Sequence, residues 1–399
     1  MRKRRVARYT ALKLLAALAF LAGTTGCWSK QELNDRTFVT TLMVDLTEQG
    51  ETEITTMFIL PNRISVGLGA APGSQKPYVA ISGKGRDIAE AFQQIQKDLP
   101  RNVAWGQMRA VIVGDRYARA GLAPLFDYFI RATDFRLRVY LFYFNGEARN
   151  LSRLTPVFER FPTEIWRESA HTKRIPPVNL RDLLSAQWNN LGDGYIPELS
   201  LHELELLTEH KSVAWSGVGG AALMKDGAVV DRFTPEEAAG ISLLKNNTPE
   251  MVVASELPEG GFFSVKLLRV QQKTRAIRRG GKVVIQVSIR GHADLVSVQA
   301  KVDLSSQDGL RTLERALNKR ILQLAQSAAD KAQEERADAY QWSEYLRYKY
   351  PSLWPKEPDH LREELFLRMK PDIHVDIVLR STGISRSPML KAQAGGLEK

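Results

Sequence analysis

Apolar residues between positions 37 and 145 recur every second position in some segments and every third or fourth in others. A period of two predicts strands, and a period near 3.6 predicts amphipathic helices. In segment 86–99, for example, Ile88 and Ile95 fall on one helical face. The predicted strands are 37–46, 51–60, 78–82, 108–113 and 138–144, and the predicted helices are 86–99 and 115–132. Because strands and helices alternate, we predict an α/β domain over residues 27–147.

Residues 148–212 have a different pattern. Prolines interrupt the segment, and the clearest element is a short helix over Leu180–Trp188, for which Asn179 is a suitable amino-terminal cap. The prolines are Pro156, Pro162, Pro176, Pro177 and Pro197. We predict a small middle domain or an elaborate connection.

Strands followed by one long helix characterise residues 213–385. A helix is expected after Thr234, because Thr234 and Glu237 form a capping box. The predicted strands are 218–224, 228–232, 251–256, 262–276, 282–295 and 373–379, and the long helix is 306–339. We predict an α+β domain whose antiparallel-rich sheet packs against the long helix. A coiled-coil partner for that helix is the alternative.

The chain as a whole is therefore predicted to be α/β and α+β, with two to three domains and mixed sheets that each pack against helices. Its length of 399 residues agrees with that number of domains. Residues 386–399 are expected to form a flexible tail.

The amino terminus has the three parts of an export signal. Basic residues come first, Leu14–Ala22 is an unbroken apolar run, and small residues lead to Cys27. The run is too short to span a bilayer, which takes about 20 apolar residues. The order resembles a bacterial lipoprotein signal, which implies that residues 1–26 are removed and that Cys27 is diacylated. Thr24 stands where such signals usually have leucine, so an ordinary signal peptide is the alternative.

Trp28 follows the predicted lipidation site directly. An indole at this position is expected to rest at the level of the lipid headgroups, so Trp28 is a candidate membrane-proximal residue. Packing on the first strand is the alternative. Beyond the signal, the longest apolar run, Val139–Phe144, suits a buried strand rather than a membrane span.

The net charge of +11 is concentrated near the amino terminus. Six basic residues precede Cys27, so their removal lowers +11 to +5. The remaining charge does not indicate a nucleic-acid partner and suits an anionic membrane surface. A solvated surface that binds no ligand is the alternative. Cys27 is the single cysteine, so no disulfide forms within the chain.

The sequence contains few motifs that indicate a catalytic, cofactor or metal site. The six histidines are not spaced as metal ligands, and we predict no metal, no cofactor and no catalytic residue. Gly217–Ala222 matches G-x-G-x-x-A, but a strand rather than a helix is expected next, so these glycines indicate a bulge or a close contact. Ser242–Lys245 matches S-x-x-K without its companion motifs and is assigned to the end of the capped helix. We predict that the protein is not an enzyme.

Several short motifs, in order, resemble the Ger(x)C lipoproteins, the C subunits of bacterial spore nutrient germinant receptors. They include Gly26-Cys27-Trp28, the strand that ends in Val44-Asp45, the opening of the carboxy-terminal domain around Gly217–Lys225, and the last strand, Asp376–Arg380. The resemblance covers nearly the whole mature chain.

That resemblance implies a lipoprotein on the outer leaflet of the spore inner membrane, held there by acyl chains in the bilayer. It further implies A and B membrane subunits as partners, a role in nutrient-triggered germination and three α/β-type domains. An extracytoplasmic solute-binding lipoprotein of a transporter is the alternative, although such proteins usually have two similar lobes. A cell-envelope hydrolase is a third class, which needs motifs that are not found here.

Overall fold

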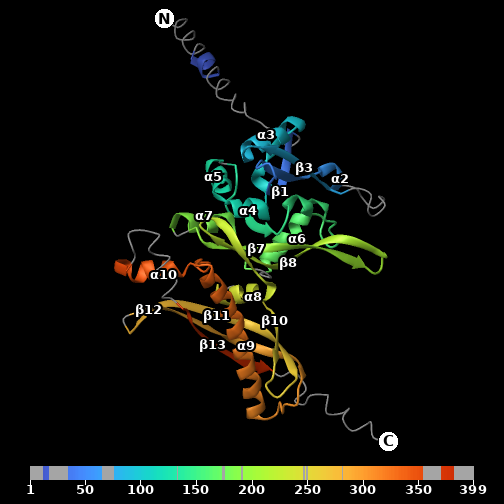
Figure 1. The fold of residues 1–399 in the computed structure, drawn as a ribbon. Coiled ribbons are helices and arrows are strands. Elements are labelled where there is room, and N and C mark those ends of the chain that lie inside the picture. Colours follow the sequence, from blue (N-terminus) through green and yellow to red (C-terminus); the bar gives the residue numbers. More distant parts are fainter. Residues whose placement is uncertain are drawn as a thin grey trace, which may run out of the picture.

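The computed structural model describes residues 12–17, 35–64, 76–132, 134–172, 176–189, 192–245, 248, 250–280, 282–353 and 370–381. Within this part, the chain forms two sheets with helices packed on them (Figure 1). The predicted tail, residues 386–399, and most of the predicted signal peptide lie outside it.

A mixed sheet of nine strands organises residues 36–233, in the order β3-β2-β1-β5-β6-β7-β8-β9, with β4 beside β1. Its strands are β1 (Arg36–Leu46), β2 (Thr52–Ile59), β3 (Tyr78–Gly85), β4 (Asn102–Ala104), β5 (Ala110–Gly114), β6 (Tyr140–Phe144), β7 (Gly194–Leu206), β8 (Lys211–Lys225) and β9 (Ala228–Phe233). The central pairs β1–β5, β5–β6 and β6–β7 are parallel. The outer pairs β1–β2, β2–β3, β7–β8 and β8–β9 are antiparallel.

Both faces of this sheet are covered, as expected for parallel strands at the centre of a sheet. In β1, Leu42 and Val44 belong to one apolar core, and Met43 belongs to a second core on the other face. The covering helices are α3 (Ile88–Asp98), α4 (Asp115–Ala120), α5 (Ala123–Arg131), α6 (Pro162–His171) and α7 (Leu180–Asn189), with the 3₁₀ turns η2 (Trp105–Gln107) and η3 (Ala148–Arg153). The short helix α2 (Pro61–Ile64) follows β2 and buries no residue.

The second sheet has the order β10-β11-β12-β13. It is formed by β10 (Val252–Glu256), β11 (Phe262–Arg279), β12 (Lys282–Gln299) and β13 (Asp372–Ser381), and only β12 and β13 run parallel. The long helix α9 (Gln307–Glu334) packs on it through an apolar stripe that includes Leu313, Leu317 and Ile321. The predicted sheet with a long helix is confirmed, and α9 packs on its own sheet.

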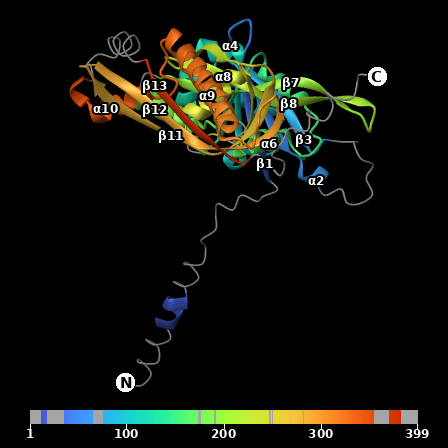
Figure 2. The ribbon, with the colours of Figure 1, turned by 90° about the horizontal axis from the view of Figure 1, so that it is seen from below.

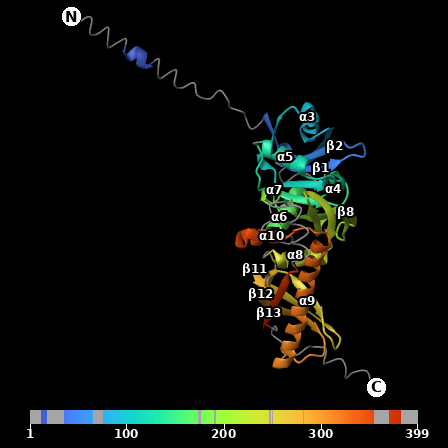
Figure 3. The same ribbon diagram turned by 60° about the vertical axis from the view of Figure 1, so that its left-hand side comes forward.

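Helix α8 (Pro235–Leu244) lies between the two sheets (Figures 1 and 3), and α9 runs alongside β13 of the smaller sheet (Figure 2). The capping box of α8 is present as predicted, because the side chains of Thr234 and Glu237 each accept a hydrogen bond from the backbone N–H of the other residue. Gly240 allows close packing, because an added Cβ would lie 2.1 Å from the Leu324 carbonyl oxygen of α9. The remaining elements are α10 (Trp342–Lys349) and η4 (Pro351–Leu353).

The structure differs from the sequence analysis between residues 194 and 225. Prolines and short helices were expected before residue 213 and a new unit after it, but β7 and β8 are long paired strands of the first sheet. Pro197 is tolerated because the pairing has a bulge between Pro197 and Leu199. The domain limits at residues 147, 212 and 385 stay predictions, and the first sheet continues across residue 213.

Candidate functional site

The predicted lipidation site Cys27 and its neighbour Trp28 lie outside the described residues. The first described residue of the folded body is Asp35, and β1 begins at Arg36. Among the helices of the described ranges, none is long and apolar enough to cross a membrane. The anchor therefore stays a prediction.

The motifs set aside in the sequence have structural roles. Gly220 adopts a positive φ of 127° within β8, and an added Cβ would lie 2.4 Å from the Phe233 carbonyl oxygen. The expected close contact is therefore present. Ser242 donates its hydroxyl hydrogen to the Ala238 carbonyl within α8, and Lys245 is the carboxy-terminal cap of that helix. Over the described ranges, no group of three or more histidine, cysteine or acidic residues is placed to hold a metal ion.

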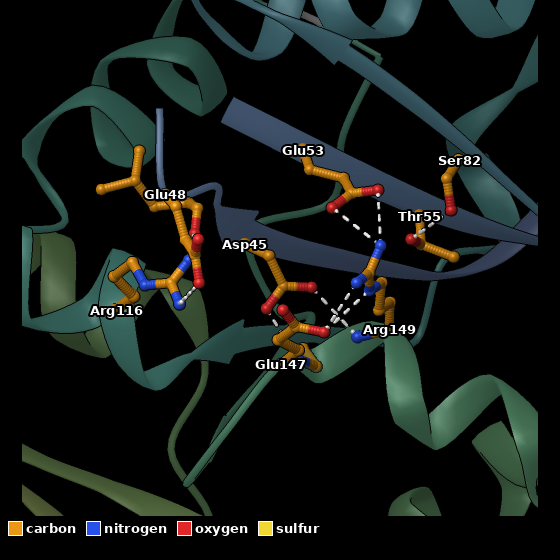
Figure 4. Close-up of polar contacts among 10 residues, drawn as sticks. Asp45, Glu48, Glu53, Thr55, Ser82, Arg116, Glu147 and Arg149 are labelled. Carbon is orange, nitrogen blue, oxygen red and sulfur yellow. Dashed lines mark hydrogen bonds and ion pairs between the residues drawn. The ribbon is translucent and has the colours of Figure 1, made fainter. Parts of the chain in front are cut away.

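A polar cluster lies where the parallel strands of the first sheet end (Figure 4). Its centre is Asp45, near the end of β1 and only 4% exposed. The Asp45 carboxylate accepts hydrogen bonds from the backbone N–H groups of Ala148 and Arg149, at 2.7 and 3.0 Å. These are the first N–H groups of η3, so Asp45 holds the start of that turn against the sheet.

The neighbouring strand leaves room for this carboxylate. Gly114 ends β5, and an added Cβ would lie 2.0 Å from Asp45 Oδ1. Burial raises the pKa of Asp45 to about 6, the two backbone hydrogen bonds oppose this shift, and the charges of Glu53 and Glu147 add to it. A buried acid of this kind is ionised at neutral pH at a cost in stability.

Arg149 compensates the acidic charge around Asp45. Its guanidinium group lies 3.2 Å from Glu53 and 2.8 Å from Glu147 (Figure 4). Glu53 comes from β2, whereas Arg149 and Glu147 come from the start of η3, so the Arg149–Glu53 pair joins segments far apart in sequence and the Arg149–Glu147 pair is local. Because Glu53 is buried, its carboxylate depends on this partner.

A second polar cluster continues along the same sheet. Tyr143 in β6 donates its hydroxyl hydrogen to Asp115, which directly follows β5 and also pairs with Arg119. Glu198 of the next strand, β7, is buried, and Arg232 of β9 binds it through two hydrogen bonds, at 2.6 and 3.0 Å. Bidentate pairing of this kind fixes the relative position of the two strands.

A third set of contacts links the first sheet to the carboxy-terminal helices. Lys331 of α9 lies 2.8 Å from Asp231 of β9. Fully buried Asp193 accepts the backbone N–H of Asp226, in the β8–β9 turn, and that of Asp338, after α9. One carboxylate therefore ties a turn of the first sheet to the segment that follows α9.

Most of these residues were missed by the sequence analysis. The strand that ends in Asp45 was noted, but its bonded partner Ala148 lies 103 residues away. Asp193 stands between Gly192 and Gly194, a turn signal that does not reveal what the side chain binds. In each cluster the carboxylates are held by backbone N–H groups, arginines, a lysine or a tyrosine, an arrangement suited to fixing segments in place.

Two family models match the chain. The first, described as the spore germination protein N-terminal domain, covers residues 29–201. The second, described as spore germination B3/GerAC like, C-terminal, covers residues 219–383. The chain therefore belongs to the GerAC-like family of spore germination proteins, and the resemblance seen in the sequence is confirmed.

Relatives from Bacillus subtilis (strain 168) agree with this assignment. The putative spore germination protein YfkR is 27% identical, over 82% of this chain and 86% of its own length. Spore germination protein KC is 23% identical, over 94% and 97%. The crystal structure of the GerBC protein has the same fold, with a TM-score of 0.56 at 17% identity over 85% of this chain and 96% of that one. The predicted fold class is confirmed.

Proposed function

We propose that the chain is the lipid-anchored subunit of a spore germinant receptor complex and is needed for nutrient-triggered germination. It acts by binding the A and B membrane subunits at the membrane surface. The observation that carries this proposal is the match to spore germination proteins over residues 29–201 and 219–383, which begins two residues after Cys27. Within the complex, this subunit is a protein-binding and structural component and performs no catalysis.

The proposed location is the outer leaflet of the spore inner membrane. Two acyl chains on Cys27 would hold the folded body stably, since a single chain binds only reversibly. Trp28 would then lie among the lipid headgroups. Confinement to the membrane raises the local concentration of the subunit near its partners, so modest contact surfaces suffice for assembly.

A solute-binding lipoprotein of a transporter is the less favoured alternative. Such proteins usually have two similar lobes, whereas the two sheets here differ in strand number and order. No observation specifically favours that alternative.

The anchor is tested by metabolic labelling with an alkyne-bearing fatty acid. We expect label in the wild-type chain and none in Cys27→Ser, with the wild type at the membrane and the variant released from it. A Ser29→Ala variant is the control for the neighbouring position. Equal labelling of wild type and Cys27→Ser would reject the anchor.

The receptor role is tested in a sporulating host that lacks its other germinant-receptor genes. Spores that carry this gene with its A and B partners are expected to respond to at least one nutrient, and deletion of this gene alone should abolish the response. Restoring the wild-type gene at another locus is the control. If spores without the gene respond as fast as spores with it, the proposed role is wrong.

A further inference from the structure

Among the residues that the structure describes, no strand pairs with one edge of the second sheet over part of its length. β11 has 18 residues, but β10 pairs only with Phe262–Lys266. From Gln271 to Arg279, β11 pairs with β12 on one side, and no strand of the described residues lies on the other. Figure 1 shows α10 beside this end of β11. An open strand edge presents backbone donors and acceptors to an incoming chain.

The direction of one carbonyl identifies the outward-facing residues. The Ala276 carbonyl accepts a hydrogen bond from Lys349 Nζ of α10, at 2.7 Å. In an antiparallel pair, alternate residues direct N–H and C=O to the same side of the strand. Thr274 and Arg278 therefore present their backbone groups to the same side as Ala276.

The opposite edge of the sheet differs, because side chains of α9 bind its backbone groups. β13 is that edge, and Asn318 of α9 both accepts the N–H and donates to the carbonyl of Ile377, at 2.8 and 3.0 Å. Glu314 of α9 accepts the N–H of Leu379 at 2.9 Å. Side chains thus take the place of a further strand beside β13, and Lys349 makes a contact of this kind beside β11.

Two exposed cations flank the open edge. The side chains of Lys273 and Arg275 lie on the opposite face of β11 from that of buried Ala276, and both are exposed. Neither has an acidic residue within 4.0 Å among the described ion pairs. Across β12, Gln286 and Ser288 stand opposite them and add only neutral groups. This face is therefore suited to carboxylates.

A cavity of about 600 Å³ lies between the edge and α10. Tyr340, Tyr345 and Tyr348 contribute aromatic surface to it, and Thr274 and Lys245 also line it. The Lys245 ammonium has a single described hydrogen-bond partner, Gln341 Oε1, at 3.5 Å. The exposed face of β11 is thus cationic, and the cavity between the edge and α10 combines tyrosine rings with Lys245, Lys349 and the acidic Glu344.

We propose that the β11 edge over residues 271–278 binds an extended segment of a partner protein as an added strand. The segment has acidic side chains on the face of Lys273 and Arg275 and apolar side chains toward the tyrosines. The open edge favours a peptide over a small anion, because a free anion would leave the backbone groups of the edge unused. The proposal deepens the proposed protein-binding role, and its test requires neither the anchor nor germination.

The test uses a fluorescent eight-residue peptide of alternating glutamate and valine, with blocked ends, and the full-length chain in detergent. We expect saturable binding by the wild type and a loss of about tenfold or more in affinity for Lys273→Glu with Arg275→Glu. Arg311→Glu, on an exposed face of α9, is the matched control and should bind as the wild type does. A peptide of alternating lysine and valine should not bind.

A backbone variant separates strand addition from simple charge attraction. Thr274→Pro keeps both cations but removes one N–H of the edge, and edge strands tolerate proline. We expect it to weaken peptide binding about tenfold with an unchanged circular dichroism spectrum, and bound peptide should slow hydrogen exchange within residues 271–278. The proposal is overturned if the wild type does not bind the peptide or if Thr274→Pro binds it with full affinity. It is also overturned if free glutamate displaces the peptide equally well, or if the peptide slows hydrogen exchange outside residues 271–278.

Discussion

Asp45 gives the protein a specific pH dependence. Its pKa rises from 3.8 in the unfolded chain to about 6 in the folded one. The folded state therefore holds the proton more tightly, and this contribution to stability is lost as the pH rises through 6. Between about pH 5 and 7.5, the free energy of unfolding of the wild type should fall by about 1.4 kcal/mol more than that of Asp45→Asn. Urea titrations of both proteins at the two pH values measure this free energy. An equal fall in the wild type and in Asp45→Asn would contradict the predicted role of Asp45.

The contact between Gly114 and Asp45 is tested by a double-mutant cycle. Gly114→Ala should cost about 2 kcal/mol, because the added Cβ would lie 2.0 Å from the carboxylate. In an Asp45→Ala background the same change should cost less, since the crowding oxygen is gone. Gly106→Ala is the control, because an added Cβ there meets nothing within 4 Å. Additive costs for Gly114 and Asp45 would show that the contact is unimportant.

At the residue scale, the sequence predicts a position but not its partners. Asp45 could be placed at the end of a strand from local pattern alone. Its hydrogen bonds to Ala148 and Arg149 depend on the order of strands in the sheet, which a single sequence does not contain. The same reason explains why Asp193 was missed. The lipidation of Cys27 stays a prediction, which rests on an export signal read as a linear segment.

The closed edge of β13 is tested through α9. Asn318→Ala should cost about 1–3 kcal/mol, because it leaves the N–H and carbonyl of Ile377 without their partners. Glu314→Gln is the matched control, because it retains an acceptor for Leu379 and should change stability by about 0.5 kcal/mol or less. Denaturant unfolding measures both. A cost for Asn318→Ala no larger than that of the control would refute this role.

Elements with strong local signals were predicted well, and those that depend on pairing were not. Helix α8 was located because its capping box is encoded within four residues. Helix α9 was located because its apolar stripe repeats over many turns. β7 was missed because Pro197 argues against a strand, and only its partner β8 explains the bulge that accommodates the proline.

At the scale of the whole molecule, the two sheets share one apolar core. A single connected cluster of buried residues includes Val44 of the first sheet, Ile241 of α8 and Ile285 of the second sheet. A boundary was predicted at residue 213 because the proline-interrupted pattern of residues 148–212 gives way there to predicted strands. Shared burial around α8 is a property of the folded chain, so we expect the two halves to unfold together.

Asp193 is the residue that tests this cooperativity. Asp193→Ala removes a buried acceptor of the N–H groups of Asp226 and Asp338, so it should cost about 3 kcal/mol or more. Hydrogen exchange should rise both in the β8–β9 turn and in the segment after α9, because the same side chain holds both. Asp226→Gly is the control, since it keeps the N–H, and glycine accepts the φ of 52° there. If only the β8–β9 turn becomes more exchangeable in Asp193→Ala, the carboxylate supports its own sheet and does not link the two halves.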